Sequence, residues 1–364
     1  MQRGNWVTKC HRGCLDFLWK PTFVAGVVSL TLSWLTAAAG SRADEGGVSF
    51  WLPGSYGSLA ATPQTPGWSF AALYYHATVT AGGNVGVARQ ITIGNLKPTV
   101  NLNSNVDLKS NVDLVFLNPN YVFASPVLGG QLAIGITGLV GRNHTSLDGT
   151  LTVSVGNLVA TRQGTLDNSV SGFGDPFPNA SLRWNSGVNN YMAYVTGGIP
   201  VGDYDPTRLA NLGIGHGALD GGVGYTYYDP TKGHEFSAVA GFTYNFKNPD
   251  TGYRNGVDSH LDWGASQFLS KQLHVGLVGY LYNQISGDSG AAPILGDFKS
   301  RVAAVGPQIG YLFPVGVLQG YLNLKGYWEF AAKNRAEGWN LWLTFSISPP
   351  TPTPPAAPPP LTRK

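Results

Sequence analysis

Charged side chains are scarce in this chain. Asp, Glu, Lys and Arg make up 12% of its 364 residues, about half of the roughly 25% that is usual for soluble proteins. The mean hydropathy is nevertheless close to zero, which is far too polar for a helical membrane protein. A transmembrane β-barrel has strands that are apolar on one face only, and this composition is typical of that class.

Cysteine is nearly absent. The chain has two cysteines, Cys10 and Cys14, and both lie close to the N-terminus. They precede an apolar run over 23–35 and a small-x-small sequence that ends at Ala43. Lys9, Arg12 and Lys20 form a basic region before the apolar run. This order predicts an export signal peptide over 1–43. A membrane anchor is the alternative, but the run is shorter than the ~20 residues that a spanning helix needs.

Removal of this presequence leaves a chain without cysteine, so disulfides and thiolate chemistry are excluded from the mature protein. The presequence carries five basic residues and one acidic residue, and its loss changes the net charge from +3 to −1. The basic character therefore belongs to the signal, and no nucleic-acid partner is expected.

Glycine and aromatic residues are abundant, with 49 Gly and 12% aromatics. The stretch 235–246, EFSAVAGFTYNF, places Phe236, Phe242 and Tyr244 at alternate positions, while Glu235 and Thr243 fall between them. Side chains alternate between the two faces of a strand, so this segment has one apolar and one mostly polar face. The pattern predicts a β-strand of about twelve residues, longer than the usual strand of a soluble protein.

The same pattern recurs along the chain, and long and short connections alternate between its copies. Outer-membrane barrels have this layout, with short periplasmic turns and longer outer loops. The sequence therefore predicts an all-β, transmembrane, antiparallel up-and-down barrel of about twelve strands. The predicted strands cover 70–78, 112–124, 131–140, 178–185, 189–200, 218–228, 234–246, 258–269, 272–285, 299–312, 317–330 and 339–348.

The predicted organisation has four parts. A signal peptide over 1–43 is followed by an irregular leader over 44–65, which is rich in Gly, Pro and Ser, and by the barrel over 66–348. Residues 349–364 form a proline-rich tail that should be extended and periplasmic. Within the barrel, polar residues predict a long loop over 82–111 and another over 142–175, the latter either plain or with a hairpin of its own.

Charged residues on the strands should point into the lumen, because a charge on the lipid face at mid-bilayer costs roughly 2–4 kcal/mol. Such groups either pair across the interior as structural contacts, which their mixed signs favour, or set the selectivity of a pore. The predicted lumen-lining residues are Arg183, Glu235, Asp262, Arg301, Lys325 and Glu329.

Two motifs could indicate chemistry. Residues 287–290, GDSG, resemble the nucleophile loop of a trypsin-like protease, but the sequence offers no matching base, so no catalytic residue is predicted. His260 lies between Asp258 and Asp262 on one strand face. Side chains along a single strand do not surround a metal unaided, so a hydrogen-bonded lumen cluster is favoured over a metal site. No metal or cofactor is expected.

Several short sequences resemble one bacterial outer-membrane family, described as the MetA pathway of phenol degradation. They are the FGDP sequence at 173–176, GGIPVG at 197–202, DSHLDW at 258–263, LHVGLVGY at 273–280 and QISGDSG at 284–290. The resemblance covers about 65–348 and implies a channel or transporter for phenolic or other hydrophobic compounds. The chain departs from common outer-membrane barrels at its end, where Phe345 is followed by further strand residues and the proline tail.

The sequence thus predicts a porin-like barrel in the outer membrane of a Gram-negative bacterium, without enzymatic activity, for passive uptake of small hydrophobic or aromatic compounds. Its expected partners are outer-membrane lipid, the barrel assembly machinery and the solute. The first alternative is a structural or adhesive barrel with a plugged lumen. A barrel enzyme of the phospholipase type is less favoured, because no recognisable His–Ser motif lies along a strand.

Overall fold

The computed structural model describes residues 49–90, 99–155, 158–290 and 299–350. These residues belong to two compact units. The described part of the first unit is 83–90, 99–106, 149–155 and 158–164, and all other described residues, including those of the leader, belong to the second. The described residues include no helix long and apolar enough to cross a membrane.

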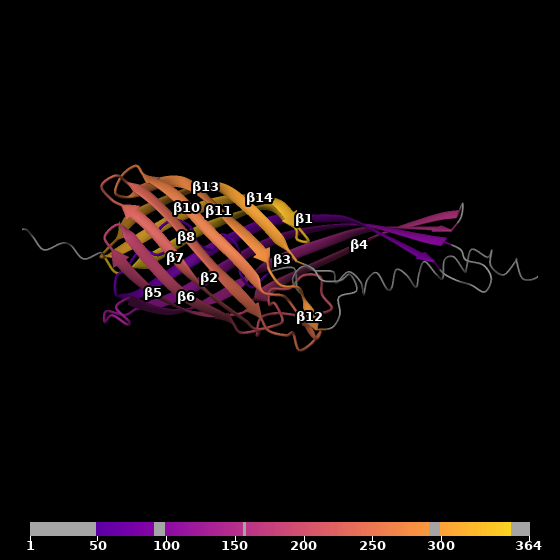
Figure 1. Ribbon diagram of the computed structural model, residues 1–364, viewed down its shortest axis with the longest axis horizontal. Helices are drawn as coiled ribbons and strands as arrows, with labels where there is room; N and C mark the ends of the chain where they lie inside the picture. The colour runs from indigo at the N-terminus through magenta and orange to yellow at the C-terminus, as the bar shows by residue number, and fades with distance from the viewer. Residues whose placement is uncertain (1–48, 91–98, 156–157, 291–298, 351–364) are drawn as a thin grey trace, which may run out of the picture. The chain divides into compact units, whose positions relative to one another are not determined.

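Twelve strands, each paired with its neighbours, form a closed antiparallel barrel, which confirms the predicted fold (Figure 1). Strand β15 pairs back with β1, with Phe70 opposite Ile347 and Tyr75 opposite Trp342. The barrel strands are β1 (Gly67–Gln90), β2 (Thr99–Val122), β3 (Gln131–Val155), β5 (Phe177–Ser186), β6 (Asn189–Gly198), β7 (Ala218–Asp229), β8 (His234–Asn245), β10 (Asp258–Phe268), β11 (Leu273–Gln284), β13 (Arg301–Val315), β14 (Leu318–Lys333) and β15 (Glu337–Ser348).

Short and long connections alternate along most of the barrel, as the sequence predicts, although the β14–β15 connection at the long-connection end has only residues 334–336. The turn between β5 and β6 needs only two residues, and Gly187 adopts a left-handed φ of 65° there, a conformation that glycine reaches without steric cost. The long connections contain β9 (Tyr253–Arg254) and β12 (Ser289–Gly290), which pair with each other.

The two long polar loops of the sequence prediction are wrong in part. Described residues 82–90 and 99–111 belong to β1 and β2, and residues 142–155 belong to β3. Strand β4 (Leu158–Phe173) pairs with β3, so the second region does contain a hairpin. Residues 99–114 alternate apolar and polar side chains except at Ser104 and Ser110, and strand periodicity prevails over the high asparagine content that suggests a loop.

Strand β8 shows how the two faces are used. Glu235, Val239 and Thr243 are buried and face the lumen, whereas Phe236 and Phe242 are exposed on the outer wall. The wall therefore turns its apolar face outward and its mixed or polar face inward, the reverse of a soluble barrel. This arrangement is suited to a lipid environment.

The outer wall allows a test of membrane exposure. Val223, midway along β7, is 64% exposed, and Val201, in the connection after β6, is 71% exposed. We expect Val223→Lys to lower the free energy of unfolding by about 2–4 kcal/mol, because lysine would enter the hydrocarbon layer. Val201→Lys is the matched control and should change it by less than about 0.5 kcal/mol. Denaturant unfolding in lipid vesicles measures both, and equal effects would contradict a membrane-facing wall.

Candidate functional site: the leader inside the lumen

The leader runs lengthwise through the barrel. Ser49 accepts hydrogen bonds from Arg335, which lies between β14 and β15 at the long-connection end. Near the other end, the amide of Gln64 donates to the side chain of Gln131 at 2.8 Å, and Gln131 is the first residue of β3. Residues 49–65 contain neither helix nor strand. The leader thus occupies the lumen as an irregular plug.

Two oppositely charged side chains hold one turn of the leader. The ammonium of Lys325, on β14, donates to the carbonyls of Gly54, Ser55 and Tyr56 at 2.6, 3.3 and 3.3 Å. The carboxylate of Asp262, on β10, accepts from the backbone N–H groups of Gly54 and Tyr56 at 2.9 and 3.0 Å. Both charged residues are at most 3% exposed. They form a clamp that binds the donors and the acceptors of the same turn.

Close approach to the wall explains the glycine in this turn. Gly54 has a φ of 87°, and a Cβ built there would lie 3.0 Å from the ring of Tyr327. A side chain would therefore meet the wall in a conformation that L-residues rarely adopt. Gly54 allows the backbone to lie within hydrogen-bonding distance of the clamp.

The second half of the leader follows β7 and β8. The amide of Leu59 donates to Glu235 at 2.9 Å, and the amide of Ala61 donates to Thr226 at 3.0 Å. Arg183, on β5, reaches the carbonyl of Ala60 at 3.5 Å. Most of these bonds use the leader's backbone, so they hold the chain without requiring particular leader side chains.

The first half is anchored by an aromatic ring. The indole of Trp51 stacks on the imidazole of His260, with ring centres 3.7 Å apart and planes 11° apart. Tyr56 and Tyr194 flank the indole, each with its ring centre 5.9 Å away. His260 also faces Asp220: its Nε2 donates to the Asp220 carboxylate at 3.0 Å, and both side chains are fully buried. Trp51 therefore covers a buried, hydrogen-bonded His–Asp pair on the wall.

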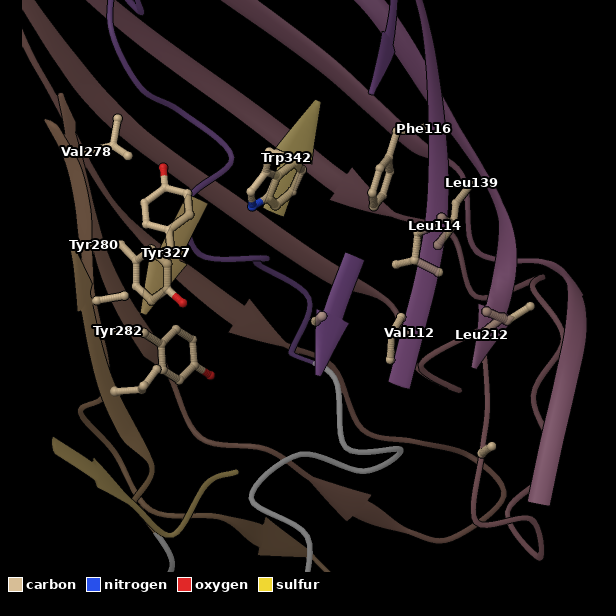
Figure 2. Close-up of a cluster of buried hydrophobic side chains, with 14 of the residues drawn as sticks. Val112, Leu114, Phe116, Leu139, Leu212, Val278, Tyr280, Tyr282, Tyr327 and Trp342 are labelled. Carbon is tan, nitrogen blue, oxygen red and sulfur yellow. The ribbon is translucent and has the colours of Figure 1, made fainter. Parts of the chain in front are cut away.

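The part of the wall that includes β2, β11, β14 and β15 is apolar and aromatic. Figure 2 shows Tyr280, Tyr282 and Tyr327 pointing inward from one side and Phe116 from the other, with Trp342 between them. Trp342 lies 4.6 Å from Tyr75 and 6.0 Å from Phe116, measured between ring centres. The lumen thus has a polar half on β5, β7, β8 and β10, which bonds to the leader, and an aromatic half, from which Lys325 of β14 also reaches the leader.

A folded connection adds to the aromatic half at its long-connection end. Asp175, from the FGDP sequence, accepts from the amides of Gly202 and Ile214 at 2.7 and 2.9 Å and so fixes both ends of the connection between β6 and β7. Leu212 of this connection is buried in the same apolar cluster as Trp342. In the same connection between β6 and β7, the hydroxyl and amide of Thr207 donate to Asp205 and lower the pKa of that carboxyl.

Four of the six predicted lumen residues contact the leader: Arg183, Glu235, Asp262 and Lys325. Glu329 instead accepts from the hydroxyl of Tyr280 at 2.6 Å. Among the described residues, no salt bridge joins two of these six side chains, so the expected pairing across the interior is replaced by bonds to the leader.

Arg301 does not line the lumen. It is exposed, on the face of β13 opposite to the buried Val302, Ala304 and Gln308. Both faces of this strand are largely apolar, so polarity alone could not assign its direction.

The cluster predicted around His260 is present, with different partners. His260, Asp258 and Asp262 are all buried, but His260 bonds to Asp220, while Asp258 accepts from Asn245 at 2.9 Å. Among the described residues, no group of three potential ligands is arranged to hold a metal. Sequence reasoning missed Asp220, whose only signal was a single carboxylate in the sequence of β7.

The GDSG sequence has a structural role. Asp288 accepts from the hydroxyl of Tyr253, from the amide of Gly256 at 2.9 Å and from the side chain of Gln284 at 2.6 Å. It therefore ties together the connections that follow β8 and β11.

The barrel fold is shared with a solved outer-membrane protein. The crystal structure of the COG4313 outer membrane channel from Pseudomonas putida F1 is similar, with a TM-score of 0.54 and 16% identity over 82% of this chain and 99% of that one. A Pseudomonas aeruginosa FadL homologue matches with a TM-score of 0.35 and 10% identity, over 85% of this chain and 96% of that one. No curated protein sequence matches the chain.

The chain belongs to the family described as "Putative MetA-pathway of phenol degradation", whose sequence pattern matches residues 96–345. This confirms the resemblance drawn from the short sequences above. The match begins within the segment between β1 and β2, so the leader lies outside it.

Proposed function

We propose that this protein is a gated outer-membrane channel for passive uptake of small hydrophobic or aromatic compounds. The observation that carries the proposal is the aromatic half of the lumen, where Tyr280, Tyr282, Tyr327 and Trp342 face the interior. Aromatic rings offer offset-stacked or edge-to-face contacts to another ring. A sugar, by contrast, would lose hydrogen bonds to water along this wall.

Passage requires the leader to move. Tyr280, Tyr327 and Trp342 are at most 2% exposed, and the leader backbone at Gly54 lies against Tyr327. The structure therefore corresponds to a closed state, which opens when the leader leaves the polar half. Membership of the phenol-degradation family supports an aromatic solute, and the fold shared with outer-membrane channels supports a transport role.

A structural barrel with a permanently plugged lumen is the second candidate. It is favoured by the number of hydrogen bonds that Lys325 and Asp262 make to one turn of the leader. In this case the leader would stabilise the barrel and would not move.

Solute influx separates the two candidates. The mature protein would be reconstituted in vesicles with lipopolysaccharide in the outer leaflet, which slows unassisted passage of phenol, and compared with vesicles without protein. We expect faster influx of phenol and no change for arabinose. Equal acceleration of both solutes would indicate a general pore, and no acceleration of either would favour the structural barrel.

A further inference from the structure

The stacked pair of Trp51 and His260 lies in a slot that the wall is built to provide. Tyr194, Gly222, Gly241 and His260 face one another across four adjacent strands, β6, β7, β8 and β10. The two glycines leave space between the larger side chains. Tyr194 extends along the wall through this space, and its hydroxyl lies 3.3 Å from Nε2 of His260.

A side chain on either glycine would collide with the rings that form the floor of the slot. A Cβ on Gly241 would overlap the hydroxyl of Tyr194 and lie 2.8 Å from the imidazole of His260, and a Cβ on Gly222 would lie 2.8 Å from the Tyr194 ring. The floor of the slot is thus made of a phenol ring and an imidazole, and the imidazole lies within 11° of parallel to the indole that covers it. Such a surface accepts a planar aromatic ring.

The slot also contains polar atoms without partners. Within the described part of the chain, Oδ1 of Asp220, Nδ1 of His260 and Nε1 of Trp51 are buried and make no hydrogen bond. The other carboxylate oxygen of Asp220 accepts from Thr243 at 2.6 Å and from His260. A buried acceptor without a donor is unfavourable. The indole covers the slot but leaves its hydrogen-bonding capacity unused.

We propose that this slot is a binding site for a small planar aromatic solute that carries a hydroxyl group, and that Trp51 occupies it when the solute is absent. The solute ring would stack on His260, and its hydroxyl would donate to the free oxygen of Asp220. A phenol ring is smaller than an indole, so it fits the space that Trp51 vacates. Solute binding would then release the leader, which deepens the proposed channel function and rests on it.

Competition between Trp51 and the solute gives the first test. Binding of 4-fluorophenol to the refolded mature protein would be measured by fluorine NMR, with phenol and cyclohexanol as unlabelled competitors. An aromatic stack contributes about 0.5–1.5 kcal/mol, so Trp51→Ala should tighten binding about two- to tenfold. Trp68→Ala is the matched control, because Trp68 is 70% exposed and lies on the first strand.

The two competitors and one further variant define the chemistry of the site. Phenol should displace the probe and cyclohexanol, of similar size but not planar, should not. Asp220→Asn in the Trp51→Ala background should weaken binding at least about threefold, since a charged acceptor becomes neutral. Unchanged or weaker binding by Trp51→Ala, or equal competition by cyclohexanol, would overturn the proposal.

Leader release gives a second test that does not need the Trp51 variant to fold. The mature chain has no cysteine, so Ser58→Cys creates a single thiol at a position where the native hydroxyl contacts Ser266 and Gln308. Phenol should accelerate labelling of this thiol by a water-soluble maleimide, and cyclohexanol should not. Phenol binding with an unchanged labelling rate would show that the slot does not control the leader.

These readouts separate the slot from transport. If phenol binds and releases the leader but does not enter vesicles, the slot inference stands and the channel proposal fails. If phenol enters vesicles while labelling at position 58 stays constant, the uptake of phenol stands, and both the movement of the leader during passage and the slot inference fail.

Discussion

Neutralising the clamp is expected to open the lumen. The double variant Asp262→Asn, Lys325→Met keeps side-chain sizes nearly constant but removes both charges that hold the leader turn. Hydrogen bonds to charged groups contribute about 1.5–3 kcal/mol each, and five such bonds join these two residues to the leader. A net loss of only 1.4 kcal/mol shifts the ratio of open to closed barrels tenfold.

We therefore expect arabinose influx into vesicles to rise at least about tenfold in the double variant. Lys333→Met is the matched control, because Lys333 is an exposed lysine at the end of the same strand, β14, and its influx should equal that of the wild type. The double change avoids leaving one buried charge without its partner, which would destabilise the barrel itself. Wild-type influx in a correctly folded double variant would mean that the clamp does not retain the leader.

The second large effect, on the free energy of unfolding, is expected where a histidine side chain packs directly on a glycine of the neighbouring strand. Gly310, on β13, lies against His274, on β11, and a Cβ built on Gly310 would overlap the imidazole. His274 is fully buried and its ring nitrogens lie 3.2 Å from the hydroxyl of Ser266 and 3.1 Å from that of Tyr321. It therefore cannot move aside without losing both contacts.

We expect Gly310→Ala to lower the free energy of unfolding by about 1–3 kcal/mol, the usual cost of overpacking. Gly326→Ala on β14 is the matched control, since a Cβ there would have no atom within 4 Å, and the change should be within about 0.5 kcal/mol. Denaturant unfolding followed by tryptophan fluorescence measures both variants. Equal stability of the two would show that the imidazole has room to relocate.

The barrel could be predicted because apolar and polar residues alternate along its strands. Phe236, Phe242 and Tyr244 must face outward together once β8 is a strand, and Glu235 and Thr243 must then face inward. The same reasoning correctly placed Lys325 in the lumen. It failed for Arg301, because β13 is apolar on both faces and alternation carries no directional information there.

The site was only half predictable. Asp262 and Lys325 could be assigned to the interior from their charge, but their partners are the amides and carbonyls of residues 54–56. Nearly every residue has these backbone groups, so a sequence does not indicate which of them bind a side chain. The stacking of Trp51 on His260 joins positions more than 200 residues apart. Neither spacing nor composition indicates which of the 10 tryptophans enters the lumen.

The division of the lumen into a bonded polar half and an aromatic half has an electrical consequence. With the leader in place, the charged groups Asp262 and Lys325 are engaged, and buried rings such as Tyr327 and Trp342 narrow the other half of the lumen. Ions need a continuous column of water, and a hydrophobic constriction excludes it. At rest the barrel should therefore conduct few ions, and a cell could keep many copies in its envelope without admitting toxic polar molecules.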